Sequence, residues 1–158
     1  MTINNLIKKI FVFSILPLLL FSCNFFTGDE VGRLKINQLS TEDNLIISET
    51  SIDFEKGDQV KIWTDMDLEY DGNIELRHFL EIYLEDEKIK EIEIDPFDKH
   101  VTIKESKMSI NGNTKWSFSG KSQEITFDKN GKYTFKAFLM AGINDDIIIK
   151  QADLVFKQ

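Results

Sequence analysis

An alternation of apolar and polar side chains runs through the chain from Gly32 onward, and it limits the fold more than any other feature. In the segment QVKIWTDMDLE, Val60, Ile62 and Leu68 share one side, while Lys61 and Asp65 lie on the other. Successive side chains of a β-strand point to opposite faces, so this spacing predicts half-buried strands. About nine such segments, separated by turn residues at short intervals, predict an all-β antiparallel sandwich.

Two segments have the pattern of a β-hairpin. In residues 75–94, ELRHFLEIYLEDEKIKEIEI, a central polar turn separates two alternating runs. A helix is the alternative, because this segment is rich in glutamate and lysine, but its period of two favours a hairpin. In MSINGNTKWSF, Asn111-Gly112 lies between two short runs. Asn-Gly tolerates the positive φ angles of a tight turn, so a second hairpin is predicted there.

The first 22 residues differ from the rest of the chain. Lys8 and Lys9 give the start a positive charge, and the eleven residues 10–20, IFVFSILPLLL, carry none. A transmembrane helix needs about 20 apolar residues, and Pro17 argues against a packed amphipathic helix. A charged start, a short apolar run and a small residue before a cleavage point are typical of a secretory signal peptide. We therefore expect residues 1–22 to be removed.

Cys23, the only cysteine of the chain, follows this apolar run. Leu20-Phe21-Ser22-Cys23 resembles the lipobox of bacterial lipoproteins, although Phe21 is bulkier than the family's commonest residue at that position. The resemblance implies a diacylglyceryl group on the thiol, cleavage before Cys23 and often acylation of the new amine, for example with palmitate. Two or more acyl chains hold a protein stably at a membrane. The alternative is an ordinary cleaved signal with a chance cysteine near the cut.

The same resemblance implies a domain organisation and a location in the bacterial cell envelope. Residues 23–31 would be the lipidated cysteine and a short tether, and residues 32–158 a single β-sandwich domain. Asn24 stands where some lipoproteins carry an aspartate that retains them in the inner membrane, so the outer membrane is favoured. Asp29-Glu30 resembles an acidic signal for export to the cell surface, but a solvated linker is the simpler interpretation. Periplasmic and surface-facing orientations both stay open.

A second resemblance lies in the segment FDKNGKYTF. Asp128, Gly131 and Tyr133 match the D-x-x-G-x-Y pattern at the E–F corner of immunoglobulin-like domains. In that family the tyrosine hydroxyl bonds back to the backbone. The resemblance implies that Tyr133, Phe135 and Ala137 face the core, and that no disulfide forms, because Phe135 replaces the usual cysteine. An immunoglobulin-like sandwich is therefore expected, with other β-sandwiches as alternatives.

Charge and composition disfavour several functions. The net charge is −8, and loss of the two lysines of the signal peptide leaves −10. Nucleic-acid phosphates require a basic surface, so this domain is not expected to bind nucleic acid. The chain has two histidines, no cysteine besides Cys23, no glycine-rich phosphate loop and no G-x-S-x-G motif. We therefore predict no cofactor, no zinc site and no enzymatic activity.

The strongest candidate for a metal site is DLEYDGNIELRH, residues Asp67–His78. Aligned with the twelve-residue EF-hand loop, it places Asp67, Glu69 and Asp71 at the first, third and fifth positions, with Gly72 at the sharp turn. That loop normally ends in a bidentate glutamate, whereas this segment ends in His78 between predicted strands. A simple turn around Gly72 is the interpretation we prefer, and calcium binding is the alternative.

Trp63 is the candidate residue for binding a ligand. It falls on the polar side of its predicted strand, beside Lys61 and Asp65. An exposed tryptophan on a sheet can serve as a platform for a sugar ring or as a hot spot for a protein partner. It is not exposed if other strands cover that face, or if a β-bulge turns the side chain inward.

Together these features predict a membrane-anchored envelope lipoprotein that displays a non-catalytic β-sandwich. Its role would be binding or structural, toward a protein partner in an envelope complex or as an immunity protein or inhibitor. A carbohydrate- or calcium-binding lipoprotein is one alternative, and an enzyme of unrecognised type is another. The sequence does not identify the partner, because a β-sandwich supports many functions.

Overall fold

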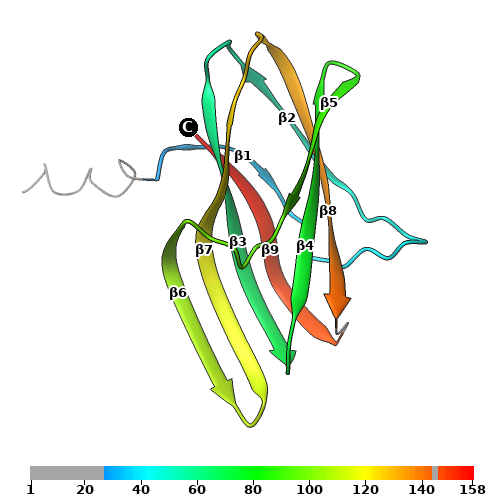
Figure 1. Ribbon diagram of the computed structural model, residues 1–158, viewed down its shortest axis with the longest axis vertical. Helices are drawn as coiled ribbons and strands as arrows, with labels where there is room; N and C mark the ends of the chain where they lie inside the picture. Colours follow the sequence, from blue (N-terminus) through cyan, green and yellow to red (C-terminus); the bar gives the residue numbers. More distant parts are fainter. Residues whose placement is uncertain (1–26, 144–145) are drawn as a thin grey trace, which may run out of the picture.

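The computed structural model describes residues 27–143 and 146–158, and they form two antiparallel β-sheets packed as a sandwich (Figure 1). The predicted signal peptide and Cys23 lie outside the described residues. The all-β sandwich of nine strands is confirmed. The strands are β1 Glu30–Leu34, β2 Ser48–Phe54, β3 Gln59–Asp71, β4 Glu75–Leu84, β5 Glu87–Ile94, β6 Val101–Ile110, β7 Asn113–Thr126, β8 Gly131–Ile143 and β9 Ile147–Lys157.

The strand order explains how far the immunoglobulin resemblance extends. The five-stranded sheet has the order β1-β9-β3-β7-β6, and the four-stranded sheet has the order β2-β8-β4-β5. The runs β3-β7-β6 and β8-β4-β5 have the adjacency of immunoglobulin strands B-E-D and F-C-C′. The last strand differs: β9 pairs with β3, and β2 takes the place beside β8 that strand G has in that family.

The core lies between the two sheets and follows the predicted alternation. Every second residue of the central strands points inward, and the sandwich is stabilised by burial of these apolar side chains. Tyr133, Phe135 and Ala137 are buried, as expected for the start of β8. The largest fully buried side chains are Leu34, Ile62, Met66, Leu68, Leu76, Leu80, Ile82, Ile94, Tyr133, Phe135, Leu139 and Phe156.

The corner before β8 has the geometry that its sequence predicts. The hydroxyl of Tyr133 donates a hydrogen bond of 2.9 Å to the carbonyl oxygen of Lys129, four residues earlier in the chain. Phe127 packs on the Tyr133 ring at 4.4 Å between centroids and stacks on Phe54 at 4.3 Å. This corner therefore fixes the turn between β7 and β8 to the core.

Both predicted hairpins are present. Asn111 and Gly112 have φ angles of 52° and 91°, and they join β6 to β7 with Ile110 opposite Asn113. Two positive φ angles in a two-residue loop match a type I′ turn. The segment 75–94 forms the β4–β5 hairpin rather than a helix, and Glu85 has a φ of 56° in its turn.

The two ends of the described domain meet. The backbone of Asp29 and that of Gln158 exchange two hydrogen bonds of 2.9 and 3.1 Å. Strand β1 then begins at Glu30, inside the stretch predicted to be tether. Among the described residues, no helix is long and apolar enough to cross a membrane.

Candidate functional site

The segment Asp67–His78 does not have the shape of an EF-hand loop. Asp67, Glu69 and Asp71 belong to the end of β3, Gly72 lies in a turn with a φ of 69°, and His78 lies inside β4. The carboxylate of Glu69 forms ion pairs with Lys115 at 3.3 Å and with Lys150 at 3.7 Å. It therefore does not point into a loop with other acidic side chains. No group of three or more potential ligand side chains that could hold a metal ion occurs in residues 27–143 and 146–158.

His78 is a core residue. Its side chain is fully buried, and its Nε2 lies 3.3 Å from the carbonyl oxygen of Ala152 on the facing sheet, while Nδ1 has no partner. Burial lowers the pKa of His78 to about 4, and the Ala152 carbonyl and the charge of Asp153 oppose this shift only in part. The imidazole is therefore neutral at neutral pH, and it is positioned by a backbone carbonyl rather than by a carboxylate.

Trp63 lies on the outer face of the five-stranded sheet, as its sequence position indicates, but it is only 2% exposed. The β3–β7 pairing has a bulge next to Trp63, but its extra residue, Ser122, is on β7. The bulge therefore does not interrupt the alternation of β3 or turn Trp63 inward. The ammonium group of Lys157 lies 4.7 Å from the centre of the ring. Trp63 therefore does not present an open ring face that could serve as a ligand platform.

An ion-pair network that sequence analysis missed occupies the outer face of the same sheet. Arg33 on β1 contacts Asp153 on β9 at 2.7 Å, Asp65 on β3 at 3.1 Å and Glu30 at 2.7 Å. Ser119 on β7 donates a hydrogen bond of 2.5 Å to Asp65. The guanidinium holds the pKa of Glu30 below its usual value. The network links four strands through one guanidinium and three carboxylates, and Oδ1 of Asp153 is buried without a hydrogen-bond partner among the described residues.

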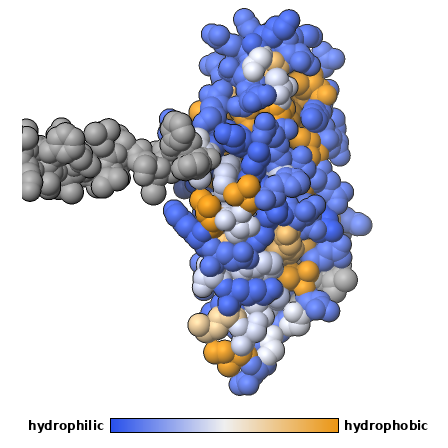
Figure 2. Space-filling model, turned by 60° about the vertical axis from the view of Figure 1, so that its left-hand side comes forward, coloured by the Kyte–Doolittle hydropathy of each residue, from blue (hydrophilic) through white to orange (hydrophobic). Residues whose placement is uncertain are grey.

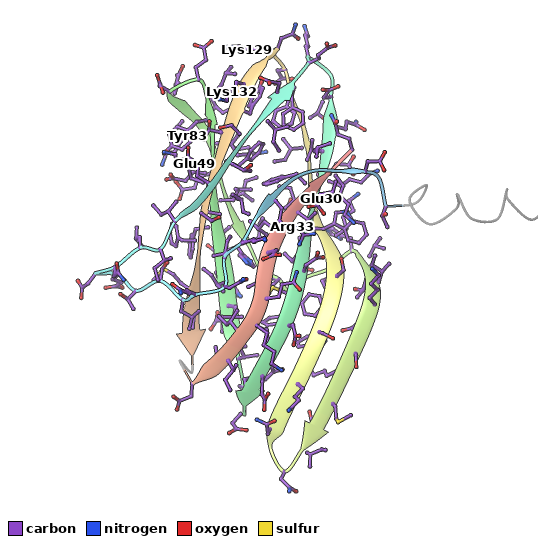
Figure 3. The ribbon with its side chains drawn as sticks, turned by 180° about the vertical axis from the view of Figure 1, so that it is seen from behind. Glu30, Arg33, Glu49, Tyr83, Lys129 and Lys132 are labelled. Carbon is purple, nitrogen blue, oxygen red and sulfur yellow. The ribbon has the colours of Figure 1, made fainter. Side chains whose placement is uncertain are left out.

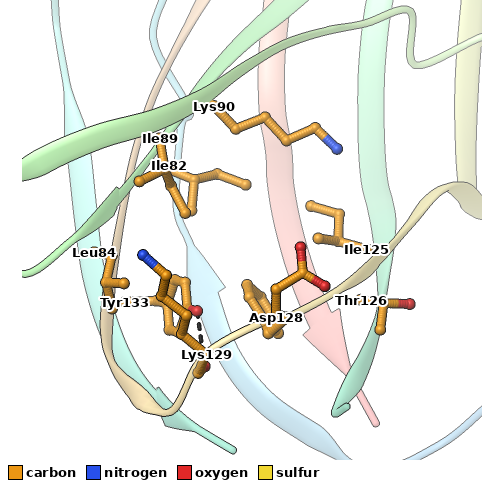
Figure 4. Close-up of a pocket in the computed structure, with 10 residues that line it drawn as sticks. Ile82, Leu84, Ile89, Lys90, Ile125, Thr126, Asp128, Lys129 and Tyr133 are labelled. Atoms are coloured by element: carbon orange, nitrogen blue, oxygen red, sulfur yellow. Dashed lines mark hydrogen bonds between the residues drawn. The ribbon is translucent and has the colours of Figure 1, made fainter. Parts of the chain in front are cut away.

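A cleft of about 330 Å³ opens at one end of the sandwich, between the β4–β5 hairpin and the β7–β8 corner (Figure 4). Along β7 the pairing with β6 ends at Lys121, so the last residues of β7 are paired with β3 on one side only and leave room beside the corner. Its walls are mainly apolar, from Ile82, Ile125 and Tyr133, and Lys90 and Lys129 lie along it. These residues can accommodate an apolar group, but they do not include a nucleophile next to a general base.

The segment 35–47, between β1 and β2, is the feature that best fits a binding role. It is thirteen residues long and has no strand of its own, and loops of this length in compact domains are commonly functional. The side chain of Asn37 accepts a hydrogen bond of 3.1 Å from the backbone of Ala152 on β9. The backbone N–H of Ser40 donates a bond of 2.7 Å to Leu139 on β8. The loop is thus fastened to both sheets.

Beyond Ser40 the loop folds back on itself. Thr41 and Asn44 exchange two backbone hydrogen bonds of 3.0 and 3.1 Å, and the hydroxyl of Ser40 accepts a bond of 2.9 Å from the backbone of Ile46. Leu45 is 47% exposed and Ile47 is 53% exposed. The arm that follows this ordered turn therefore presents two large aliphatic side chains to solvent, which is unlike the usual polar loop.

The position of the loop relative to the tether supports this interpretation. In Figures 1 and 3 the described chain begins on one side of the sandwich, near Glu30, and loop 35–47 projects from the opposite side. Glu42 and Asp43 form the turn at the tip of the loop and are exposed, so Leu45 and Ile47 lie next to an acidic tip. The loop has no period-two pattern and no recognised motif, which is why sequence analysis passed over it.

Comparisons of the chain with protein-family models, with curated proteins and with solved structures found no match.

Proposed function

We propose that this protein is a lipid-anchored lipoprotein of the bacterial cell envelope that binds a protein partner, without catalysis, through loop 35–47. The observation that carries the proposal is the ordered loop that exposes Leu45 and Ile47 on the side away from the tether. A domain held at Cys23 would direct this loop away from the membrane, where a partner could reach it.

The shape and charge of the loop favour a protein as the partner. Small-molecule sites are concave and enclose most of the ligand, whereas this loop projects from the surface. Two aliphatic side chains on a projection match an apolar groove of another protein, in which a few buried residues supply most of the binding energy. Since Glu42 and Asp43 lie next to these aliphatic side chains, the groove is expected to have a basic rim.

The anchor is tested by replacing Cys23 with serine. If the lipobox works as proposed, the wild-type chain fractionates with membranes and migrates as a processed form, whereas Cys23→Ser is unprocessed or soluble. Metabolic labelling with an alkyne fatty acid should mark the wild-type chain only. Wild-type and variant chains with identical fractionation, migration and labelling would contradict lipidation.

The loop is tested by placing a photo-crosslinking amino acid at position 45 of the full chain in living cells. Ile148 is the matched control position, because it is also aliphatic and 58% exposed but lies on β9, away from the loop. A discrete adduct from position 45 that is absent from position 148 would support the proposal, and mass spectrometry would identify the partner. Equal adducts from both positions, or none from position 45, would contradict it.

The cleft in Figure 4 favours a second candidate function, the binding of a small amphiphilic anion. Apolar walls suit an aliphatic chain, and the ammonium groups of Lys90 and Lys129 suit its charged end, although Asp128 also lies there. Titration of the protein with dodecanoate should give saturable binding that weakens in Lys90→Glu/Lys129→Glu. Binding that is the same in wild type and variant would count against this use of the cleft.

A further inference from the structure

Strand β6 is the free edge of the five-stranded sheet, and its second half is unusually open to solvent. Residues 106–110 are all exposed, and the hairpin that they form with β7 extends to the lower end of the molecule (Figure 1). Met108 is 59% exposed and Ile110 is 62% exposed. Figure 2 shows apolar side chains gathered at this lower tip.

The turn fixes which backbone groups of β6 are free. Ile110 and Asn113 flank the two-residue turn, so they form a hydrogen-bonded pair, and Met108 pairs with Lys115 in the same way. Lys107 and Ser109 then occupy the non-hydrogen-bonded positions, and their N–H and C=O groups point away from β7. The hydroxyls of Ser109 and Thr114 approach to 2.8 Å, as the close side chains of such a pair should.

This part of β6 has fewer of the features that usually protect an edge strand than β5 and β1 have. Natural edges are shielded by charges, prolines, bulges or short length. Strand β5, an edge of the other sheet, reads EKIKEIEI and alternates charged residues, and β1 has five residues and a bulge. The bulge in β6 lies between Ile103 and Ser106, and residues 106–110 contain one charge, Lys107, and no proline.

We propose that β6 pairs with β6 of a second copy of this chain, antiparallel, about a two-fold axis at Met108. In this register Lys107 of one copy lies opposite Ser109 of the other, so the free groups of both residues form four intermolecular hydrogen bonds. An axis at Lys107 would oppose two lysines, which is destabilising. An axis at Ser109 would place Lys107 opposite the turn residue Asn111 and lose half of the bonds.

The same register makes the apolar side chains self-complementary. Met108 lies opposite its own copy on the outer face of the sheet, and Ile110 of each copy lies diagonally next to the Met108 of the other. The two five-stranded sheets then form one continuous sheet. Strand pairing alone buries less surface than the roughly 1,600 Å² typical of stable complexes, so the dimer is expected to be weak. The dimer involves neither loop 35–47 nor the cleft. The proposal of a dimer is therefore independent of the proposed function.

The register can be tested with single cysteines in the full chain. Met108→Cys places two thiols at a non-hydrogen-bonded pair, where Cα atoms are about 4.5 Å apart, close enough for a disulfide. Ile110→Cys is the matched control, because it is equally exposed but four residues from its own copy, roughly 13 Å along the strand at about 3.3 Å per residue. The parent chain controls for crosslinks through Cys23.

After mild oxidation, we expect a dimer band on a non-reducing gel at least five-fold stronger for Met108→Cys than for Ile110→Cys or the parent chain. Adding Ser109→Pro should remove this band, because proline eliminates an outward N–H without breaking the β6–β7 ladder. Ser109→Ala should keep it. Thermal unfolding would verify that both variants are folded. Equal crosslinking at positions 108 and 110, no crosslinking at position 108, or crosslinking that persists in a folded Ser109→Pro variant would overturn the proposal.

Discussion

His78 couples the stability of the sandwich to pH, because its imidazole is fully buried and neutral in the folded protein. Replacement of His78 by leucine should remove this coupling. Leucine is of similar size and suits a position between the buried Leu76 and Leu80, so the variant is expected to fold.

The magnitude follows from the two pKa values of the imidazole. In the unfolded chain its pKa is about 6.5, and burial lowers the pKa of His78 in the folded protein to about 4. Below pH 6.5 the unfolded state therefore binds a proton that the folded state excludes, and the free energy of unfolding falls as the pH falls. At about 1.4 kcal/mol per pKa unit, the loss is about 1 kcal/mol at pH 5.5 and between about 2 and 3 kcal/mol at pH 4.5. Above pH 6.5 the contribution is fully present.

The assay is urea unfolding, followed by tryptophan fluorescence, at several pH values between 7.5 and 4.5 for a soluble chain that begins at Asn24. The carboxylates titrate in both proteins, so their effects cancel in the difference between wild type and His78→Leu. That difference should shift by between about 2 and 3 kcal/mol in favour of the variant over this range. A difference that stays constant from pH 7.5 to 4.5 would show that the imidazole is accessible to protons in the folded state.

Three further substitutions test the packing, each by urea unfolding at pH 7.5. Tyr133→Phe removes the 2.9 Å bond to Lys129 and should cost about 1 kcal/mol; no loss would mean that the corner is held by ring packing alone. Arg33→Leu leaves the buried Asp153 short of a partner and should cost about 3 kcal/mol, while the double variant with Asp153→Leu should recover much of it; two independent, additive losses would contradict a shared network. Gly112→Ala should cost about 1 to 2 kcal/mol through its φ of 91° alone, because its surroundings are open, and a neutral result would mean that the turn adopts another conformation.

The local features of the fold could be predicted from the sequence because they depend on neighbouring residues. The alternation in β3 and β4 determines which side chains point inward. Asn111-Gly112 determines a turn through its own backbone preferences. The pattern around Tyr133 determines a corner that closes on Lys129, four residues away.

Features that depend on distant residues could not be predicted. The alternation at the C-terminus predicts a strand, but Leu154 and Phe156 would be inward whether β9 joined β8 or β3. Arg33 and Asp153 are 120 residues apart, and no local pattern links them. His78 was placed at the end of a possible calcium loop because polar residues precede it, although it occupies an inward position of the β4 alternation.

Loop 35–47 could not be predicted from the sequence for a related reason. Its order comes from Asn37 and Ser40, which bond to the backbone of β9 and β8, far along the chain. Composition alone does not distinguish a fastened loop from a loose one. The exposure of Leu45 and Ile47 also depends on that fastening, so it became visible only in the structure.

The placement of β1 between the tether and loop 35–47 has a mechanical consequence. If the chain is held at Cys23 and a partner pulls on the loop, both points of attachment lie within the first 47 residues, and the tension runs along this N-terminal segment. Strand β1 is already extended at about 3.3 Å per residue and has little slack. The load would act on the bonds of Asn37 and Ser40 to β9 and β8 and on the pairing of β1 with β9, and the few bonds of the loop would open before the β1–β9 ladder. Loop 35–47 would therefore be the extensible part of the molecule, and the sandwich, β1 included, would stay folded while the distance to the partner changes.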